Sequence, residues 1–383
     1  MEWANVIKGK ESLNVTTDSR KVTSGSVFVA LKGEHFDGND FVEQARLAGA
    51  EYIICGDNAL QDLQDLARAW RRELGLPIIG ITGTNGKTTT KELCAAVLST
   101  KYNLFYTQGN LNNQIGVPLT LLNITRAHEM AIVEMGASHP GDIKELVEIA
   151  EPNYGLITNV GRAHLEGFGS FEGVMRTKAE LYDFLRAHGG FCFRNTDNPY
   201  LAQMAGDLTT VPYTTGTMPE GTHLVGGYNA ENVSAAICVG EYFGINREDA
   251  LAAIRAYVPS NNRSQLLQTE RNTVVVDAYN ANPTSMTAAI NAFQGNCYIL
   301  GAMRELGTYS HLEHQNIVNM LLERKADKVL LVGPEYKQTT APYPIYDNVE
   351  ALCEALQQTP LTGYRILLKG SRSNQLEKVI PLL

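Results

Sequence analysis

A glycine-rich segment that joins an apolar run to a helix-like stretch constrains this chain more than any other feature. The apolar residues 77–79 lead into the sequence GITGTNGKTTT at 80–90, and residues 91–98 have the pattern of a helix. A strand, a glycine-rich turn and a helix N-terminus together form a cradle for phosphate, because backbone N–H groups and the helix dipole favour an anion. Lys87 would add a positive charge, and Thr88 would add a hydroxyl ligand for Mg²⁺. The segment therefore predicts ATP binding.

The spacing of this segment departs from the standard phosphate loop. Five residues rather than four separate Gly80 from Gly86, and Ile81 stands where a glycine is expected. A glycine-rich turn that holds no ligand is the alternative interpretation. The strand before the turn and the helix after it favour the phosphate loop, since both are needed to aim backbone amides at an anion.

Length and composition indicate a globular protein of several domains. The chain has 383 residues, which is too many for one ordinary core, so we expect two or three domains. Apolar residues make up 44% and charged residues 19%, as in a folded globular chain. The net charge is −9 and no dense basic run occurs, which argues against a nucleic-acid partner.

Cysteine usage and the first residues predict a cytoplasmic location. The six cysteines are scattered singly with no C-x-x-C pair, as expected for small buried residues in a reducing compartment. No apolar run is long enough to cross a membrane, and the first residues lack the basic and apolar regions of a secretory signal. Since no feature suggests an obligate partner, we expect a monomer without membrane insertion.

Alternating strand-like and helix-like runs predict an α/β protein of three domains. Residues 1–75 contain short strand-like runs and end in a charged helical stretch, with a hinge at 75–77. Residues 76–259 alternate strands and helices, which implies a parallel sheet covered on both faces. Residues 260–383 form a smaller α/β domain. The expected fold is a central P-loop parallel-sheet ATPase domain, flanked by a small N-terminal α/β domain and a C-terminal Rossmann-like α/β domain.

Two polar side chains follow strand-like runs of the central domain. Glu134 ends the apolar run 130–134, and His164 lies in a glycine-rich loop after the run 154–160. The carboxyl end of a strand beside a phosphate loop is where a magnesium-binding carboxylate is expected. Taken alone, His164 fits an ordinary surface residue as well as a metal ligand.

Several ordered segments connect the chain to a known family. Those of the central domain are GTNGKTT at 83–89, GNLNNQIG at 109–116, EMGAS at 134–138 and TNVGRAHL at 158–165. Together they resemble the Mur ligases, which are ATP-dependent enzymes that form amide bonds in peptidoglycan synthesis. Other segments resemble the branch that joins D-alanyl-D-alanine to UDP-N-acetylmuramoyl-tripeptide: DSR at 18–20, FVALKGEHFDGNDF at 28–41, HLEGFGS at 164–170, YNANPTSM at 279–286 and LLKGSRS at 367–373.

The resemblance implies a reaction in two steps. ATP activates a peptide carboxylate as an acyl phosphate, and the amine of D-alanyl-D-alanine then attacks it. The implied cofactors are ATP and Mg²⁺, and the implied substrates are UDP-N-acetylmuramoyl-tripeptide and D-alanyl-D-alanine. Negative charge develops on oxygen in both steps, so cations matter more than an acid–base pair.

The resemblance also implies which residues hold the nucleotide. From the phosphate loop these are Gly83, Thr84, Asn85, Gly86, Lys87, Thr88 and Thr89, with Lys87 on the β- and γ-phosphates. Further contacts are expected from Asn229, Asn232, Arg263, Asp277, Asn280 and Asn282. A helix N-cap is the competing interpretation of Asn229.

Four residues are implied as metal ligands. Thr88 and Glu134 would hold one Mg²⁺, and His164 would help to place a second. Lys178 matches a lysine that the family uses as a carbamate, which turns a cation into an anionic oxygen ligand. The alternative for Lys178 is an ordinary solvated helix lysine.

Substrate contacts are implied in three groups. The uridine diphosphate sugar would meet Asp18, Ser19, Arg20, Lys32, Asp37 and Asn39, and the reaction centre would contain Asn112 and Asn113. The peptide or D-alanyl-D-alanine would meet Arg304, Glu305, Lys369, Ser371 and Arg372, because guanidinium groups pair well with carboxylates. Surface salt bridges are the alternative for these last charges.

Two departures from the family pattern leave other functions open. Ala302 stands where the family has Asp, and the segment 193–226 is short for the family, as if a β excursion had been trimmed. One alternative is a Mur-type ligase with a different acceptor. Another is a catalytically impaired scaffold that binds nucleotide and UDP-sugar.

Overall fold

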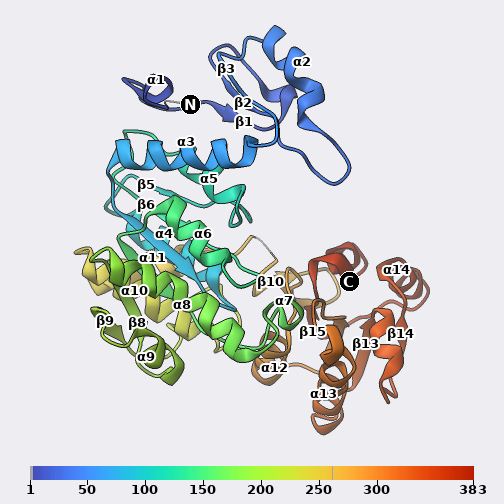
Figure 1. Cartoon of the computed structure of the whole chain (residues 1–383). Coiled ribbons are helices and arrows are strands. Elements are labelled where there is room, and N and C mark those ends of the chain that lie inside the picture. Colours follow the sequence, from blue (N-terminus) through green and yellow to red (C-terminus); the bar gives the residue numbers. More distant parts are fainter. Residues whose placement is uncertain (1–2, 261) are drawn as a thin grey trace. The chain divides into compact units, whose positions relative to one another are not determined.

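The computed structural model describes residues 3–260 and 262–383 (Figure 1). The chain divides into two compact units, each assembled from separate stretches of sequence. The first takes Met1–Gly83, Leu98–Ile157 and Arg176–Tyr213, and the second takes Thr84–Val97, Thr158–Met175 and Thr214–Leu383. The sheets of the first unit and the sheet of the second confirm the α/β class that the sequence predicts.

The first unit begins with a small parallel sheet. Its strands β1 (Val15–Thr16), β2 (Val27–Val29) and β3 (Tyr52–Ile54) lie in the order β1-β2-β3. The short helices around it are α1 (Ala4–Ile7), η1 (Ser19–Lys21), η2 (Gly38–Phe41) and α2 (Val42–Leu47). Phe28 and Ala45 are buried in the small core between this sheet and α2.

A six-stranded parallel sheet forms the centre of the first unit. Its strands are β4 (Ile78–Thr82), β5 (Leu104–Tyr106), β6 (Met130–Glu134), β7 (Tyr154–Ile157), β8 (Phe191–Asn195) and β9 (Thr210–Tyr213), in the order β5-β6-β4-β7-β8-β9. All neighbouring pairs are parallel, which confirms the predicted parallel sheet. Since β4 pairs with both β6 and β7, the strand order changes direction at β4. Ligands of open α/β sheets bind at the carboxyl ends of strands at such a switch point.

Helices α5 (Gly116–Leu122), α6 (Asp142–Ala150), α8 (Phe171–Ala187) and α9 (Pro199–Ala205) connect these strands. Gly155 lets α8 approach the sheet, because a Cβ there would lie 2.5 Å from Leu185. Helix α6 begins at Asp142 with Gly141 at the N-cap, so the helical first turn that Pro140 suggests at 139–141 is not formed. Gly141 has φ 90°, a conformation that a side chain disfavours, and it lies in the turn that leads into the helix.

Helix α3 (Ala59–Leu74) packs against α5 and α6 (Figure 1), and several long-range hydrogen bonds hold it there. The fully buried Trp70 donates from Nε1 to the Ile124 carbonyl at 2.8 Å. Arg71 donates to the Ala150 carbonyl and to Asn153 Oδ1, both at 3.0 Å. The helix ends at Gly75, whose φ of 64° is left-handed.

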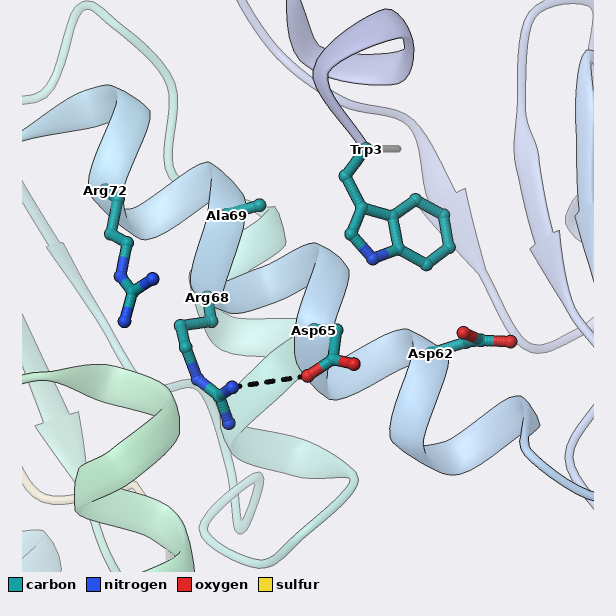
Figure 2. A pocket seen from close by; sticks show the side chains of 6 residues that line it. All are labelled: Trp3, Asp62, Asp65, Arg68, Ala69 and Arg72. Atoms are coloured by element: carbon teal, nitrogen blue, oxygen red, sulfur yellow. Dashed lines mark hydrogen bonds and ion pairs between the residues drawn. The ribbon is translucent and has the colours of Figure 1, made fainter. Parts of the chain in front are cut away.

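A pocket of about 310 Å³ lies between α3 and the residue before α1. Figure 2 shows its lining, in which Trp3 points toward α3 and Asp65 pairs with Arg68 at 3.3 Å. Arg68 also donates to the Glu148 carbonyl, and Arg72 pairs with Glu151. The pocket is lined by none of the residues that the sequence proposes for substrate or nucleotide.

The second unit contains a six-stranded mixed sheet. Its strands are β10 (Gln265–Gln268), β11 (Thr273–Asp277), β12 (Cys297–Gly301), β13 (Lys328–Val332), β14 (Ile345–Tyr346) and β15 (Arg365–Lys369), in the order β10-β11-β15-β12-β13-β14. Only the pair β10–β11 is antiparallel among these neighbours.

Side chains of this sheet alternate between two buried layers. Val275 and Leu367 pack with α12 (Pro283–Ala292) and α13 (Ser310–Glu323), whose shared core also holds Ile317. Val276 and Leu368 face the other layer, formed by α14 (Val349–Gln358) and η6 (Leu376–Leu382). The remaining short helices are η3 (Gly307–Tyr309), η4 (Pro334–Gln338) and η5 (Arg372–Asn374). Helices therefore cover both faces of this sheet, as is usual in α/β domains.

Helices α4 (Lys87–Leu98), α7 (Leu165–Phe168), α10 (Asn229–Tyr242) and α11 (Arg247–Ala256) complete the described elements. A Cβ on Gly240 of α10 would lie 2.5 Å from Val97 of α4, so these two helices are closely packed. Residues 214–228 contain no helix or strand beyond the single bridge between Leu224 and Gln265. None of the helices in residues 3–260 and 262–383 is long and apolar enough to cross a membrane.

Candidate functional site

The loop after β4 is held in shape by the segment that follows β7. Thr84 donates its backbone N–H to the Asn159 carbonyl at 2.9 Å, and Asn85 donates its own to Asn159 Oδ1 at 3.0 Å. In return, Gly161 N–H donates to the Thr84 hydroxyl at 3.0 Å. The motifs GTNGKTT and TNVGRAHL, which are about 75 residues apart in sequence, thus form one hydrogen-bonded loop pair.

The N-terminus of α4 has the electrostatics of an anion site. Lys87 and Thr88 lie in its first turn, which contains no acidic residue. Lys87 Nζ donates to the Thr84 carbonyl at 3.1 Å, so the ammonium lies against the loop. The partial positive charge of a helix N-terminus and a lysine at the same point favour phosphate.

The side chain of Asn232 packs against the phosphate loop at Gly86 and is hydrogen-bonded to Thr90. Gly86 has φ 79°, and a Cβ there would lie 2.4 Å from Asn232 Oδ1. The same oxygen accepts a hydrogen bond from the Thr90 hydroxyl at 3.0 Å, and Asn232 Nδ2 donates to Asn229 Oδ1 at 2.9 Å. Both asparagines are buried next to the loop. Asn229 is not the N-cap of α10, because Tyr228 occupies that position.

Glu134 lies at the carboxyl end of β6, paired in register with Ile81 of β4. Its side chain is 1% exposed, and Oε1 accepts a hydrogen bond from Asn112 Nδ2 at 2.8 Å. Asn112 therefore orients the carboxylate. Asn113 acts differently, since its Oδ1 accepts the backbone N–H of Gly116 at 2.9 Å and fixes the start of α5.

The donor chemistry fits Mg²⁺. The Glu134 carboxylate and, in the other unit, the Thr88 hydroxyl each offer the kind of oxygen donor that Mg²⁺ prefers, alongside phosphates and water. In residues 3–260 and 262–383, no three His, Cys, Asp or Glu side chains gather into a metal-binding group.

Lys178 projects from α8 and is 2% exposed. The solvated lysine of the alternative interpretation is therefore wrong for this position. A buried ammonium is costly unless its charge is compensated, and conversion to a carbamate changes that charge.

His164 Nδ1 lies against a carboxylate oxygen of Glu305, which brings a predicted metal residue next to a predicted substrate residue. Both have left-handed backbones, with φ 48° at His164 and 60° at Glu305. Non-glycine residues in this region are uncommon and occur at functional sites. Glu166 also donates its backbone N–H to the Glu305 carbonyl at 3.4 Å.

Asn282 joins the phosphate loop to α12. It is the N-cap of α12 in a capping box with Ser285, and its Nδ2 donates to Asn85 Oδ1 at 2.8 Å. The structure thus brings together two asparagines that the sequence assigned separately to the nucleotide.

Two guanidinium groups contact one aromatic ring in the second unit. The Arg263 carbon Cζ is 3.8 Å from the centre of the Tyr279 ring, and that of Arg372 is 5.4 Å away. Arg263 Nε and Ser371 Oγ are buried, and neither has a hydrogen-bond partner. Like charges on one ring with unsatisfied donors favour an anionic ligand. Sequence reasoning missed Tyr279, although it lies in the YNANPTSM motif.

The buried Lys369 pairs with the partly buried Asp277, a contact that sequence analysis did not predict. Lys369 is 1% exposed, and its Nζ donates to Asp277 Oδ2 at 2.6 Å and to the Asn280 carbonyl at 3.1 Å. Arg304, by contrast, is exposed and bonds to Glu335 and to Ser373.

The predicted UDP-sugar residues form two small hydrogen-bonded groups. Asp18 caps η1 and pairs with Arg20 at 2.8 Å, and the hydrogen bonds from Arg20 lower the Asp18 pKa to about 2. Asp37 caps η2, and the hydrogen bonds from Asn39 lower its pKa. Lys32 lies 4.0 Å from Asp37. Ser19 donates to Gln44, at 3.4 Å.

Family models match the chain in domain order. The Mur ligase family catalytic domain matches residues 13–96, the Mur ligase middle domain residues 81–219, and the Mur ligase glutamate ligase domain residues 262–372. The chain belongs to the Mur ligase family.

Curated relatives of this Mur ligase are similar over nearly its whole length. The UDP-N-acetylmuramoyl-tripeptide–D-alanyl-D-alanine ligase of Bacillus subtilis is 35% identical over 96% of this chain and 92% of its own. The ligase of that name from Escherichia coli is 32% identical over 96% and 93%. The Bacillus alignment spans 423 positions, more than the 383 residues of this chain, so the relative has residues that this Mur ligase lacks.

Solved structures have the same fold. MurF from Acinetobacter baumannii has a TM-score of 0.85 and 26% identity, covering 99% of this chain and 97% of its own. MurF ligase from Thermotoga maritima, in complex with ADP, has a TM-score of 0.86 and 28% identity, covering 98% of each chain. The Mur ligase described here therefore has the three-domain α/β fold that its sequence predicts.

Proposed function

We propose that this Mur ligase joins D-alanyl-D-alanine to UDP-N-acetylmuramoyl-tripeptide, converting ATP to ADP and phosphate, in peptidoglycan precursor synthesis. The similarity to curated ligases of that name over 96% of the chain carries the proposal. The phosphate loop adds independent support, because its amides, Lys87 and the start of α4 form an anion site.

Nucleotide binding begins at the loop of residues 83–89. Lys87 holds the β- and γ-phosphates, and Asn232 keeps the loop open beneath them by its contact with Gly86 and Thr90. Arg263, stacked on Tyr279, meets the phosphates with its unsatisfied Nε. Thr88 and Glu134 would hold Mg²⁺, which neutralises phosphate charge when bound.

The tripeptide carboxylate then attacks the γ-phosphate, which forms an acyl phosphate and releases ADP. The amine of D-alanyl-D-alanine attacks the acyl carbon, and phosphate leaves as the amide forms. Ser371 and Arg372 receive the peptide carboxylate, because the hydroxyl is buried without a partner and the guanidinium is exposed beside it. Glu305 orients His164. The Lys178 side chain acts in its carbamate form, as an anionic oxygen ligand.

The three expected domains divide this work. Residues 1–75 bind the UDP-sugar, 76–259 bind ATP, and 260–383 complete the nucleotide and dipeptide sites. The enzyme acts as a monomer in the cytoplasm. Light scattering of the purified chain at assay concentration tests the first point, and fractionation of cells tests the second.

Phosphate release from ATP tests the proposed reaction. Purified protein receives Mg²⁺, UDP-N-acetylmuramoyl-tripeptide and D-alanyl-D-alanine, and each component is omitted in turn. We expect release only when both substrates are present, with the pentapeptide product identified by its mass. ATP binding without release would favour a different acceptor or an impaired scaffold.

Lys178→Ala tests the carbamate. The variant should fold and bind ADP while turnover falls by roughly 100-fold or more, the scale of losing a metal-orienting group. In the wild type, ¹³C-labelled CO₂ should give a carbamate resonance that the variant lacks. Unchanged turnover in the variant would remove Lys178 from the mechanism.

A further inference from the structure

The connection between β12 and α13 contains two proposed substrate residues, which are exposed, and the residues on either side of them are buried. Met303 and Leu306 are 1% and 2% exposed and belong to the core between the sheet and α13. Arg304 and Glu305, between them, are exposed. We call residues 302–306 the presenting loop. Its apolar residues point inward, so its two charged residues point outward.

His314 on α13 fixes this loop through the backbone. The side chain is fully buried, and Nε2 accepts the Met303 backbone N–H at 3.0 Å. Nδ1 lies 2.7 Å from the Ser310 carbonyl. Since a carbonyl only accepts, Nδ1 carries the proton, and Nε2 is then an acceptor only in the neutral imidazole. The edge contact with Tyr336, at 4.8 Å and 87°, holds the ring plane.

The charged end of the presenting loop has specific partners. The carboxylate of Glu305, whose φ is 60°, contacts His164 Nδ1. Arg304 Nε donates to Ser373 at 3.2 Å, and Arg304 also pairs with Glu335. A left-handed backbone at a glutamate is retained only where neighbouring contacts enforce it. The Met303 backbone N–H, two residues before Glu305 in the sequence, is held by its hydrogen bond to His314.

We propose that His314 is a positioning residue of the ligase reaction, whose neutral imidazole anchors the Met303 amide and thereby places Arg304 for the peptide and Glu305 for His164. This inference rests on the proposed function. In this proposal His314 does not touch the substrate. It holds the Met303 amide, the amide fixes the presenting loop, and the loop directs the side chains of Arg304 and Glu305.

The environment of His314 favours the neutral ring. Burial lowers its pKa below the ordinary 6.5, and Arg304 adds to this, whereas the Ser310 carbonyl, Glu335 and Glu313 oppose it. Protonation would place an N–H donor against the Met303 N–H and break the anchor. Because the unfolded chain takes up this proton at higher pH than the folded chain, stability from the neutral ring is complete above about 6.5 and decreases as pH falls through the lowered pKa. Turnover should decrease on the same acid side.

Three variants of the full chain test the inference. His314→Leu removes the acceptor, His314→Gln restores an acceptor oxygen that does not titrate, and His311→Gln is the control, since His311 is exposed on the same helix. We expect His314→Leu to lose roughly 10- to 100-fold in kcat, the scale of a 1 Å misplacement, with the KM for ATP unchanged. His314→Gln should recover most of kcat and lose the part of the acid limb that His314 causes, and His311→Gln should match the wild type.

Amide hydrogen exchange of residues 301–307 provides a second measurement on the same proteins. Exchange should be faster in His314→Leu than in His314→Gln and His311→Gln. Wild-type kcat in His314→Leu, or an unchanged acid limb in His314→Gln, overturns the inference. If His314→Leu does not fold, the pH profile of His314→Gln decides. If the wild type ligates no D-alanyl-D-alanine, the proposed function fails, and exchange in His314→Gln against the wild type across pH still decides whether His314 anchors the loop.

Discussion

Replacing Gly86 with Ala should damage the phosphate loop in two separable ways. The residue has φ 79°, so an alanine there adopts a left-handed backbone. This costs about 1–2 kcal/mol. The new Cβ would also lie 2.4 Å from Asn232 Oδ1. Because Thr90 and Asn229 hold Asn232 by hydrogen bonds, it has little freedom to move, and overpacking of this kind costs about 1–3 kcal/mol.

The sum predicts a loss of about 2–5 kcal/mol, shared between folding stability and nucleotide affinity. Urea unfolding measures the first, and calorimetric titration with ADP measures the second. The background variant Asn232→Ala removes the clash but not the backbone strain, so Gly86→Ala should cost about 1–3 kcal/mol less in that background. Equal costs in the two backgrounds would refute the steric argument, and wild-type stability and affinity in Gly86→Ala would refute both.

Three further substitutions have outcomes that the structure predicts. Asp277→Asn leaves the Lys369 ammonium buried without its counter-charge and should cost about 3–5 kcal/mol in urea unfolding, partly recovered by adding Lys369→Met. Ala302→Asp places a carboxylate at a fully buried position close to Glu335, so stability should fall by about 3 kcal/mol without a gain in turnover; higher turnover would contradict this. Trp70→Phe loses the indole hydrogen bond of α3 and should cost about 2–3 kcal/mol by the same unfolding assay, whereas an unchanged midpoint would show that the bond contributes little.

Hydrophobic runs and periodicity in the sequence predicted individual strands and helices correctly. The apolar run ending at Glu134 is a strand, and the helix predicted over residues 91–98 is part of α4, which begins earlier, at Lys87. Periodicity also predicted a helix before Gly75, which α3 confirms from Ala59 onward. A proline is common in the first turn of a helix, yet Pro140 lies before α6 because the left-handed Gly141 sets the helix start.

Pairings between distant residues could not be predicted in this way. The bond from Lys369 to Asp277 joins residues 92 apart, and that from Arg71 to Ala150 joins residues 79 apart. Neither composition nor spacing records such a partner. From the sequence alone, such charged residues are interpreted as surface residues or substrate ligands. Only the strand order of the sheet shows that the ends of β11 and β15 lie side by side. Family resemblance assigned roles to Lys369 and Asp277 but not their mutual contact.

The attachment of α3 has a practical consequence for dividing the chain. Gly75 resembles a natural cut point, yet a fragment beginning after it would lack Trp70 and Arg71 and expose the surfaces of α5 and α6 that these side chains cover. The Ala150 and Ile124 carbonyls would turn from internal acceptors into groups facing water. A central fragment intended to fold by itself should therefore begin before Asn58. It then keeps α3, which packs against α5 and α6.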